Sequence, residues 1–392
     1  MEATTLGVEE EFQLLDPASL ALTSAAPALL AVAGRPELVS ELPLSQVEAV
    51  TPVCGSLAEV RAQVTRLRGL AADAAVATGS RLASCGTAPL AEWRLNAASD
   101  DPKYDALKVL AGHLVAEQLI AGLHVHVGVP DAERAVAVLD RSRAWLPVLL
   151  ALSASSPMWA GRDSGFASWR TVHWRRWPVS GPPPHFGSAQ RYAVAIAALL
   201  ATGVVARESQ VYWDARRSVS FPTVEFRVAD AVHTVDEAVM VAGLVRGLAR
   251  AALADHDAGI GLDPLPDAAL RVATWVAARH GLTGGLVDPE SGLTSAAPQV
   301  VRRLLDRVRP HLGDEAADVE EPVARLLVDG TGSDRQRAAA ARGGLRAAAE
   351  LVVAETVAGV PRAGLPRVHA PAGGDLDASD RALAADRPPH HG

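Results

Sequence analysis

The sequence predicts an α+β fold in which helices cover one face of a mainly antiparallel sheet. Three short segments alternate between apolar and ionisable residues with the period of two that a strand requires. Longer segments repeat apolar residues at helical spacing, and several begin with capping motifs. A sheet with one apolar face must bury that face against another layer, and these helices can supply it.

The first elements are marked by turn and capping signals. Alternation around Glu9 and Glu11, which ends at an Asp-Pro turn signal, predicts a strand over residues 5–15. Ser56 and Glu59 form a capping box ahead of regularly spaced apolar residues, which predicts an amphipathic helix over residues 56–78. The remaining predicted elements are helices over 101–119, 131–150 (disturbed at Pro147), 188–203 and 234–254, a strand over 219–230, and a helical stretch to about 358.

Two segments differ from this pattern. Residues 157–188 place four tryptophans among glycines and prolines, which predicts a long ordered loop with a function. Residues 361–392 are rich in Pro, Gly, Asp and Ala, which predicts a disordered tail after a single catalytic domain over residues 1–360. The apolar run 193–206 is shorter than the roughly 20 residues that span a bilayer, so it predicts a buried helix and no membrane association.

Composition excludes several classes of function. The 37 Lys and Arg against 45 Asp and Glu give a net charge of −8, which argues against nucleic-acid binding. Because Lys103 and Lys108 are the only lysines, a GxxxxGK[ST] phosphate loop is impossible. Cys54 and Cys85 belong to no Cys cluster, and residues 1–13 lack the features of a signal peptide. The sequence therefore predicts a cytoplasmic protein.

The three alternating segments carry the candidate chemistry. Each puts apolar side chains on one face and ionisable side chains on the other. The paired ionisable residues are Glu9 with Glu11, His124 with His126, and Glu225 with Arg227. Glu10 points to the apolar side by the same alternation, which predicts a structural role. A sheet with one solvated face would explain any one segment, but three together suit a polar cavity.

The ligand chemistry of this cavity favours a hard divalent cation. Carboxylate oxygens with an imidazole suit Mg²⁺ or Mn²⁺ better than zinc, which prefers His and Cys in a closed set. A further segment, from Glu41 to Glu48, adds two more carboxylates. Two other classes stay open at this point: a transition-metal hydrolase or cupin-like enzyme that uses the His124/His126 pair, and a non-catalytic binding module.

Four motifs in a fixed order carry a family resemblance. They are GVEEEF near the start, VEAVTP at 47–52, GLHVHVG at 122–128 and FPTVEFRVAD at 221–230. Together they resemble the glutamate–cysteine ligase type 2 family, the YbdK-like carboxylate–amine ligases, over residues 5–358. The resemblance implies a fold similar to the glutamine synthetase catalytic domain, a curved sheet with helices on its outer face. It also makes a homodimer the expected assembly.

The resemblance further implies an activity and its residues. Members of such a family would join a carboxylate to an amine through an acyl phosphate, using ATP and Mg²⁺, with weak glutamate–cysteine ligase activity and acid and amine substrates that are small molecules. The residues that match the family's metal ligands are Glu9, Glu11, Glu41, Glu48, His124 and Glu225. Arg227 is the expected catalytic residue, because its guanidinium can bind two phosphoryl oxygens. The expected substrate or nucleotide contacts are His126, Arg162, Arg170 and Arg176.

Overall fold

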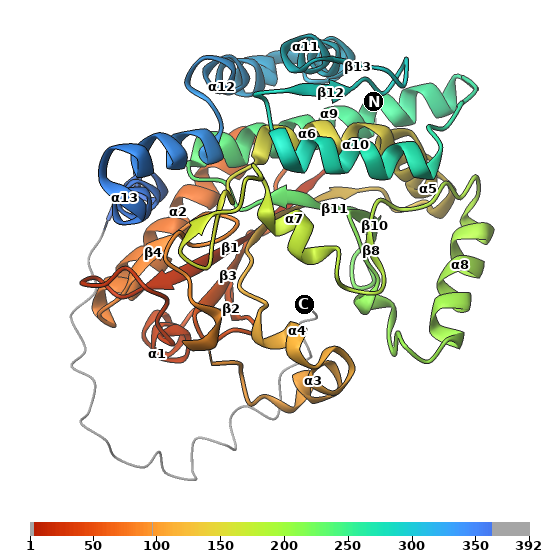
Figure 1. Ribbon diagram of the computed structural model, residues 1–392. Helices are drawn as coiled ribbons and strands as arrows, with labels where there is room; N and C mark the ends of the chain where they lie inside the picture. The colour runs from red at the N-terminus through yellow and green to blue at the C-terminus, as the bar shows by residue number, and fades with distance from the viewer. Residues whose placement is uncertain (1–3, 96, 363–392) are drawn as a thin grey trace.

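A mainly antiparallel sheet lies at the centre of the computed structural model, which describes residues 4–95 and 97–362 (Figure 1). Within these residues the sheet has seven strands in the order β10-β11-β5-β1-β3-β2, and β4 also pairs with β1. The strands are β1 (Leu6–Leu15), β2 (Leu38–Ser40), β3 (Gln46–Val50), β4 (Arg81–Ala83), β5 (Gly122–Gly128), β10 (Ala215–Arg217) and β11 (Thr223–Asp230). Every pairing in this sheet is antiparallel, which confirms the predicted α+β class.

The helices gather mostly on one face of the sheet (Figure 1). α2, α6 and α9 contact strands of the sheet directly, and α11 and α12 pack on α9 as a further layer. The helices are α1 (Ala26–Ala33), α2 (Leu57–Ala77), α3 (Asp105–Ala111), α4 (His113–Ala116), α5 (Ala132–Ser142), α6 (Leu146–Ser153), α7 (Trp169–Trp174), α8 (Ala189–Ala201), α9 (Val235–Asp257), α10 (Asp267–His280), α11 (Ala297–Val308), α12 (Ala316–Asp329) and α13 (Gly332–Thr356). The main core lies between the apolar sides of β1, β5 and β11 and these helices.

Capping signals located helix starts correctly. The Ser56 side chain accepts from the Glu59 amide at the start of α2, and Thr234 and Glu237 complete a reciprocal capping box at the start of α9. Both helices begin one residue after the cap and run close to their predicted lengths.

Several predicted elements need correction. The helix predicted over 101–119 is broken into α3 and α4 at Gly112, whose φ of +50° cannot continue a helix. The helix predicted over 131–150 breaks at residues 143–145, and Pro147 lies in the first turn of α6, where proline is tolerated. The predicted loop 157–188 contains α7 and the short strands β6 (Met158–Trp159), β7 (Arg162–Asp163) and β8 (Ser180–Gly181), of which β8 pairs with β9 (Tyr212–Trp213).

Two further predictions were wrong in part. The stretch to residue 358 is helical except for a hairpin of β12 (Gly285–Val287) and β13 (Thr294–Ala296). The apolar run 193–206 does not form a buried helix, because α8 buries only Tyr192 and Ile196 and leaves Val194 63% exposed. Six of the 13 residues of α8 are alanines, whose small side chains cost little when exposed.

Glu10 lies on the apolar side of β1, as alternation predicted, and forms a buried ion pair with Arg68 of α2. The Arg68 Nη2 to Glu10 Oε1 distance is 2.6 Å, and the Arg68 side chain is 0% exposed. The same guanidinium donates to the carbonyls of Val232 and His233 after β11, and more weakly to that of Thr356 at the end of α13. This one arginine therefore ties together the first strand, the segment that follows β11 and the last helix.

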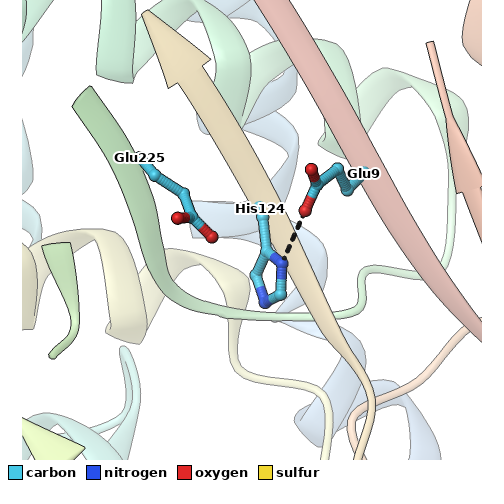
Figure 2. A group of neighbouring side chains, drawn as sticks. All are labelled: Glu9, His124 and Glu225. Atoms are coloured by element: carbon cyan, nitrogen blue, oxygen red, sulfur yellow. Dashed lines mark hydrogen bonds and ion pairs between the residues drawn. The ribbon is translucent and has the colours of Figure 1, made fainter. Parts of the chain in front are cut away.

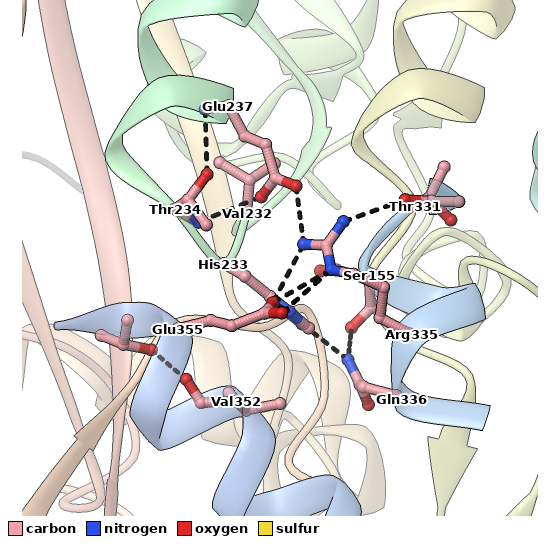
Figure 3. A network of polar contacts seen from close by, with 12 residues as sticks. Ser155, Val232, His233, Thr234, Glu237, Thr331, Arg335, Gln336, Val352 and Glu355 are labelled. Carbon is pink, nitrogen blue, oxygen red and sulfur yellow. Dashed lines mark hydrogen bonds and ion pairs between the residues drawn. The ribbon is translucent and has the colours of Figure 1, made fainter. Parts of the chain in front are cut away.

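A second polar network fixes α13 against the segment that follows β11 (Figure 3). His233 is fully buried, with Nδ1 2.7 Å from Glu355 Oε2 and Nε2 2.9 Å from the Gln336 amide nitrogen. Arg335 also binds both Glu355 and Glu237 at the start of α9. The network attaches α13 to the segment that follows β11 and to the start of α9.

No helix among the described residues is long and apolar enough to cross a membrane. The tail predicted for residues 361–392 lies outside the described residues, apart from Pro361 and Arg362.

Candidate functional site

The sheet face opposite α2, α6 and α9 carries the ionisable side chains that alternation predicted. In the strand register Glu9 lies opposite His124, and Glu11 lies opposite Glu48. Glu225 of β11 lies opposite His126 of β5. Directly opposite residues of an antiparallel pair point to the same face, so four strands converge on one polar surface.

Two groups of ligand atoms form on this surface and share His124. Figure 2 shows Glu9, His124 and Glu225 pointing toward one another from β1, β5 and β11. The second group is Glu11, Glu48 and His124, and within each group the ligand atoms lie within 4.8 Å of one another. His124 Nδ1 lies 3.1 Å from Glu9 Oε2, which fixes the imidazole ring. Neither group includes His126, whose Nε2 lies 3.1 Å from Glu9 Oε1 on the same face.

The charges in this cluster are crowded. Burial raises the pKa of Glu48 well above its ordinary value, and repulsion from Glu9, Glu41 and Glu11 raises it further. Burial alone would also raise the pKa of Glu9, but hydrogen bonds from His124 and His126 outweigh it and hold the pKa well below its ordinary value. Hard oxygen donors that repel one another in this way fit Mg²⁺ or Mn²⁺, which would neutralise them.

Two arginines hold the late-strand carboxylate. Arg216 Nε lies 2.8 Å from Glu225 Oε2, and Arg227 Nη1 binds the other oxygen, Oε1. The arginines outweigh the burial penalty and hold the pKa of Glu225 below its ordinary value. Arg216 is itself fixed by the carbonyls of Ser209 and Val211. Glu225 is therefore ionised and held in place within the first ligand group.

Arg216 was missed by the sequence analysis. It lies in the three-residue strand β10, directly opposite Glu225. The sequence did offer one signal, an Arg-Arg pair at 216–217 followed by a turn-forming segment and then by the predicted strand. Two strands joined by a short turn form a hairpin, and β10 and β11 pair in this way.

The remaining predicted residues divide into two sets. Glu41, His126 and Arg170 line the same pocket as the ligand groups. Glu41 lies close enough to raise the pKa of Glu48 but joins neither group. Arg162 lies exposed in β7, and Arg176 binds Glu117 at the surface, so neither lines the pocket.

Aromatic side chains also line the pocket. Trp174 and Trp177 from the predicted functional loop lie against Tyr212, with ring centroids 5.0 to 5.8 Å apart. Tyr104, ahead of α3, also lines the pocket. Two tryptophans of that loop thus reach the pocket, and they give it a face suited to a flat or apolar part of a ligand.

Replacing Glu48 with glutamine should stabilise the protein in EDTA and weaken binding of Mn²⁺. Since the pKa of Glu48 is raised on folding, its contribution to stability is largest below the pKa of the unfolded chain and is lost as pH rises through the folded pKa. Glutamine cannot ionise, so its advantage should grow to about 1 kcal/mol or more at high pH. Urea unfolding of both proteins at pH 5 and pH 8 measures this, and a pH-independent difference would contradict it.

Comparison with known proteins shows the family of the chain. The model of the glutamate–cysteine ligase family 2 (GCS2) matches residues 5–354. A protein of Saccharopolyspora erythraea called "putative glutamate–cysteine ligase 2-1" is 44% identical over 337 residues, which are 85% of this chain and 89% of that protein. One of Rhodopirellula baltica, called "putative glutamate–cysteine ligase 2", is 39% identical over 91% of this chain and 98% of its own length.

Solved structures share the fold at low sequence identity. The glutamate–cysteine ligase of Francisella tularensis, in complex with AMP, has a TM-score of 0.68 at 12% identity, over 90% of this chain and 87% of that one. A bifunctional glutathione synthetase from Pasteurella multocida has a TM-score of 0.63 at 16% identity, over 90% of this chain and 53% of that one.

Proposed function

The chain belongs to glutamate–cysteine ligase family 2, and from this premise we propose that it is an ATP-dependent carboxylate–amine ligase. One observation supports the proposal above the others: two groups of ligand atoms share His124 in one pocket, beside two largely buried arginines. Such a site can neutralise a triphosphate next to an anionic substrate. The relatives' names make glutamate and cysteine the first pair to test, and we expect weak turnover of that pair.

The reaction needs two steps because a carboxylate is a poor electrophile. A carboxylate oxygen of the acid attacks the γ-phosphorus of ATP, the bond from γ-phosphorus to the bridging oxygen breaks, and ADP leaves. The amine nitrogen then attacks the carbonyl carbon of the acyl phosphate. Inorganic phosphate leaves with the bonding electrons, and the nitrogen loses a proton. The balance is acid plus amine plus ATP to amide plus ADP plus phosphate.

The residues of this chain have distinct parts in that scheme. Glu9 and Glu225 would hold one Mg²⁺ ion and Glu11 and Glu48 another, and His124 would complete one of the two sets, because a neutral imidazole has a single nitrogen lone pair to donate. Bound Mg²⁺ supplies positive charge that offsets the phosphate oxygens. Arg227 would bind the transferring phosphoryl group.

The other predicted contacts follow from position. His126, which lines the pocket and lies 3.1 Å from Glu9, would contact substrate. Glu41 would contribute charge at the pocket wall. Arg162 and Arg176, which do not line the pocket, have no role in this scheme.

The direct test measures phosphate release from ATP and Mg²⁺ with amino acids supplied singly and in pairs, with mass spectrometry of the products. We expect one pair to stimulate release and to give an adduct whose mass is the sum of the two minus water. If no pair does so and ATP does not bind, the proposal is wrong. Retention of a transition metal without affinity for nucleotide would favour a hydrolase instead.

We place this activity in the cytoplasm, and the buried free thiols of Cys54 and Cys85 are consistent with a reducing compartment. A homodimer stays a prediction, which sedimentation of the purified protein would test.

A further inference from the structure

β11 carries an irregularity at the residues that matter most for the proposed reaction. Its register with β5 shifts between Phe226 and Ala229, so that two residues, Arg227 and Val228, stand opposite the single residue His124. Such a β-bulge reverses the alternation of all later side chains in the strand. Asp230 consequently lies opposite Gly122, on the polar side of the sheet.

Arg170 of α7 donates hydrogen bonds to the two carbonyl groups of this bulge. Its Nη2 donates to the Arg227 carbonyl at 3.1 Å and its Nη1 to the Val228 carbonyl at 3.4 Å. The side chain is only 6% exposed. It can reach the strand because residue 122 is glycine: a Cβ there would lie 2.4 Å from Arg170 Nη2. The glycine that begins the GLHVHVG motif therefore makes room for an arginine from the tryptophan-rich loop.

Asp230 anchors the start of α7 to the end of the same strand. Its carboxylate accepts from Ser156 Oγ at 2.7 Å and from Ser168 Oγ at 2.8 Å. Ser168 is the N-cap of α7, and Ser156 Oγ also accepts from the Arg170 amide at 3.0 Å. The helix that carries Arg170 is thus fixed on β11 at the residue that the bulge turns to this side.

Few side-chain contacts orient the guanidinium of Arg227. Among the described residues its guanidinium bonds only to Glu225, two positions earlier on the same strand, and its Nε is buried without a hydrogen-bond partner. The Arg227 side chain is 11% exposed and lines the pocket. Its direction is therefore set by its own backbone, which Arg170 holds.

We propose that Arg170 is a positioning residue that holds the β11 bulge so that Arg227 points at the transferring phosphoryl group. The proposal rests on the ligase function proposed above. It replaces the substrate contact predicted for Arg170, because both of its Nη groups are already engaged by carbonyl oxygens. Catalysis is sensitive to such placement, since a shift of about 1 Å in a catalytic group costs about 100-fold in rate.

The test is a double-mutant cycle. Arg170→Met should lower kcat about 100-fold with little change in the KM for ATP, and Arg170→Lys, which keeps one donor, should recover part of the loss. In an Arg227→Ala background, where no guanidinium remains to be misplaced, Arg170→Met should change the residual single-turnover rate less than about twofold. A full loss in both backgrounds would show that Arg170 contacts the reactants directly and would overturn the proposal.

Arg143→Met is the matched control. Arg143 is also buried and donates to two carbonyls, those of Pro183 and Leu265, but it does not line the pocket. Its loss should lower the melting temperature comparably and leave kcat of the folded protein unchanged.

A crystal structure of Arg170→Met gives a readout that needs no turnover. Arg227 should have left Glu225, or the bulge should have shifted; if both are unchanged, the positioning role is wrong. Absence of any ligation by the wild-type protein would refute the proposed function alone.

Discussion

Glu9→Gln is expected to abolish Mg²⁺-dependent turnover, with a loss of about 1000-fold or more in kcat, while the fold survives. The substitution removes one ligand charge from the group with His124 and Glu225. Its neighbours tolerate the change, because both hydrogen-bond partners are histidines that can be neutral and glutamine keeps an acceptor oxygen. Phosphate release measures the loss, and circular dichroism with thermal unfolding shows whether the protein is folded.

The corresponding change on β11, Glu225→Gln, should also affect stability. Glu225→Gln leaves Arg216 and Arg227 facing a neutral side chain, and both arginines are largely buried. Removing one partner from a buried ion pair costs about 3–5 kcal/mol, so this variant should lose stability as well as turnover. If Glu9→Gln unfolds the protein as readily as Glu225→Gln, the assignment of Glu9 to a ligand role without a packing role is wrong.

Glu10→Gln should lower the free energy of unfolding by about 3–5 kcal/mol, because it leaves Arg68 as an unpaired charge in the core. Replacing Arg68 with methionine at the same time should not restore stability. The carbonyls of Val232 and His233 would then lose their donor. Urea unfolding of the single and double variants measures both effects.

Glu92→Gln is the control for this prediction. Glu92 pairs with Arg94 at the surface, where the two side chains are 40% and 65% exposed. An exposed pair of this kind contributes less than about 1 kcal/mol. If Glu10→Gln proves no more destabilising than Glu92→Gln, the Arg68 ion pair does not hold the fold together.

Much of the candidate site followed from one periodicity. Alternation in β1 and β5 predicted which faces carry Glu9, Glu11, His124 and His126, because a period of two is a local property of the strand. Glu10 was assigned to the packed side on the same ground, and the structure confirms it.

What the sequence could not predict depends on contacts between distant segments. A bulge adds a residue without a local signal, so the role of Asp230 on the polar side was hidden by an otherwise regular alternation. Arg216 lies in a strand of three residues, too short to show a period. The loop arginines have no periodicity at all, and only packing decides that Arg170 reaches the pocket while Arg162 stays outside it.

The Arg68 contacts also have a consequence for how the protein is made. The bond from Arg68 to the Thr356 carbonyl joins residues 288 positions apart, and that to Val232 spans 164. Contacts this distant in sequence slow folding, because the loop they close must first lose its entropy. During synthesis the first strands and α2 emerge long before their partners on β11 and α13 exist. The contacts of Arg68 therefore stay incomplete until nearly the whole described chain has left the ribosome.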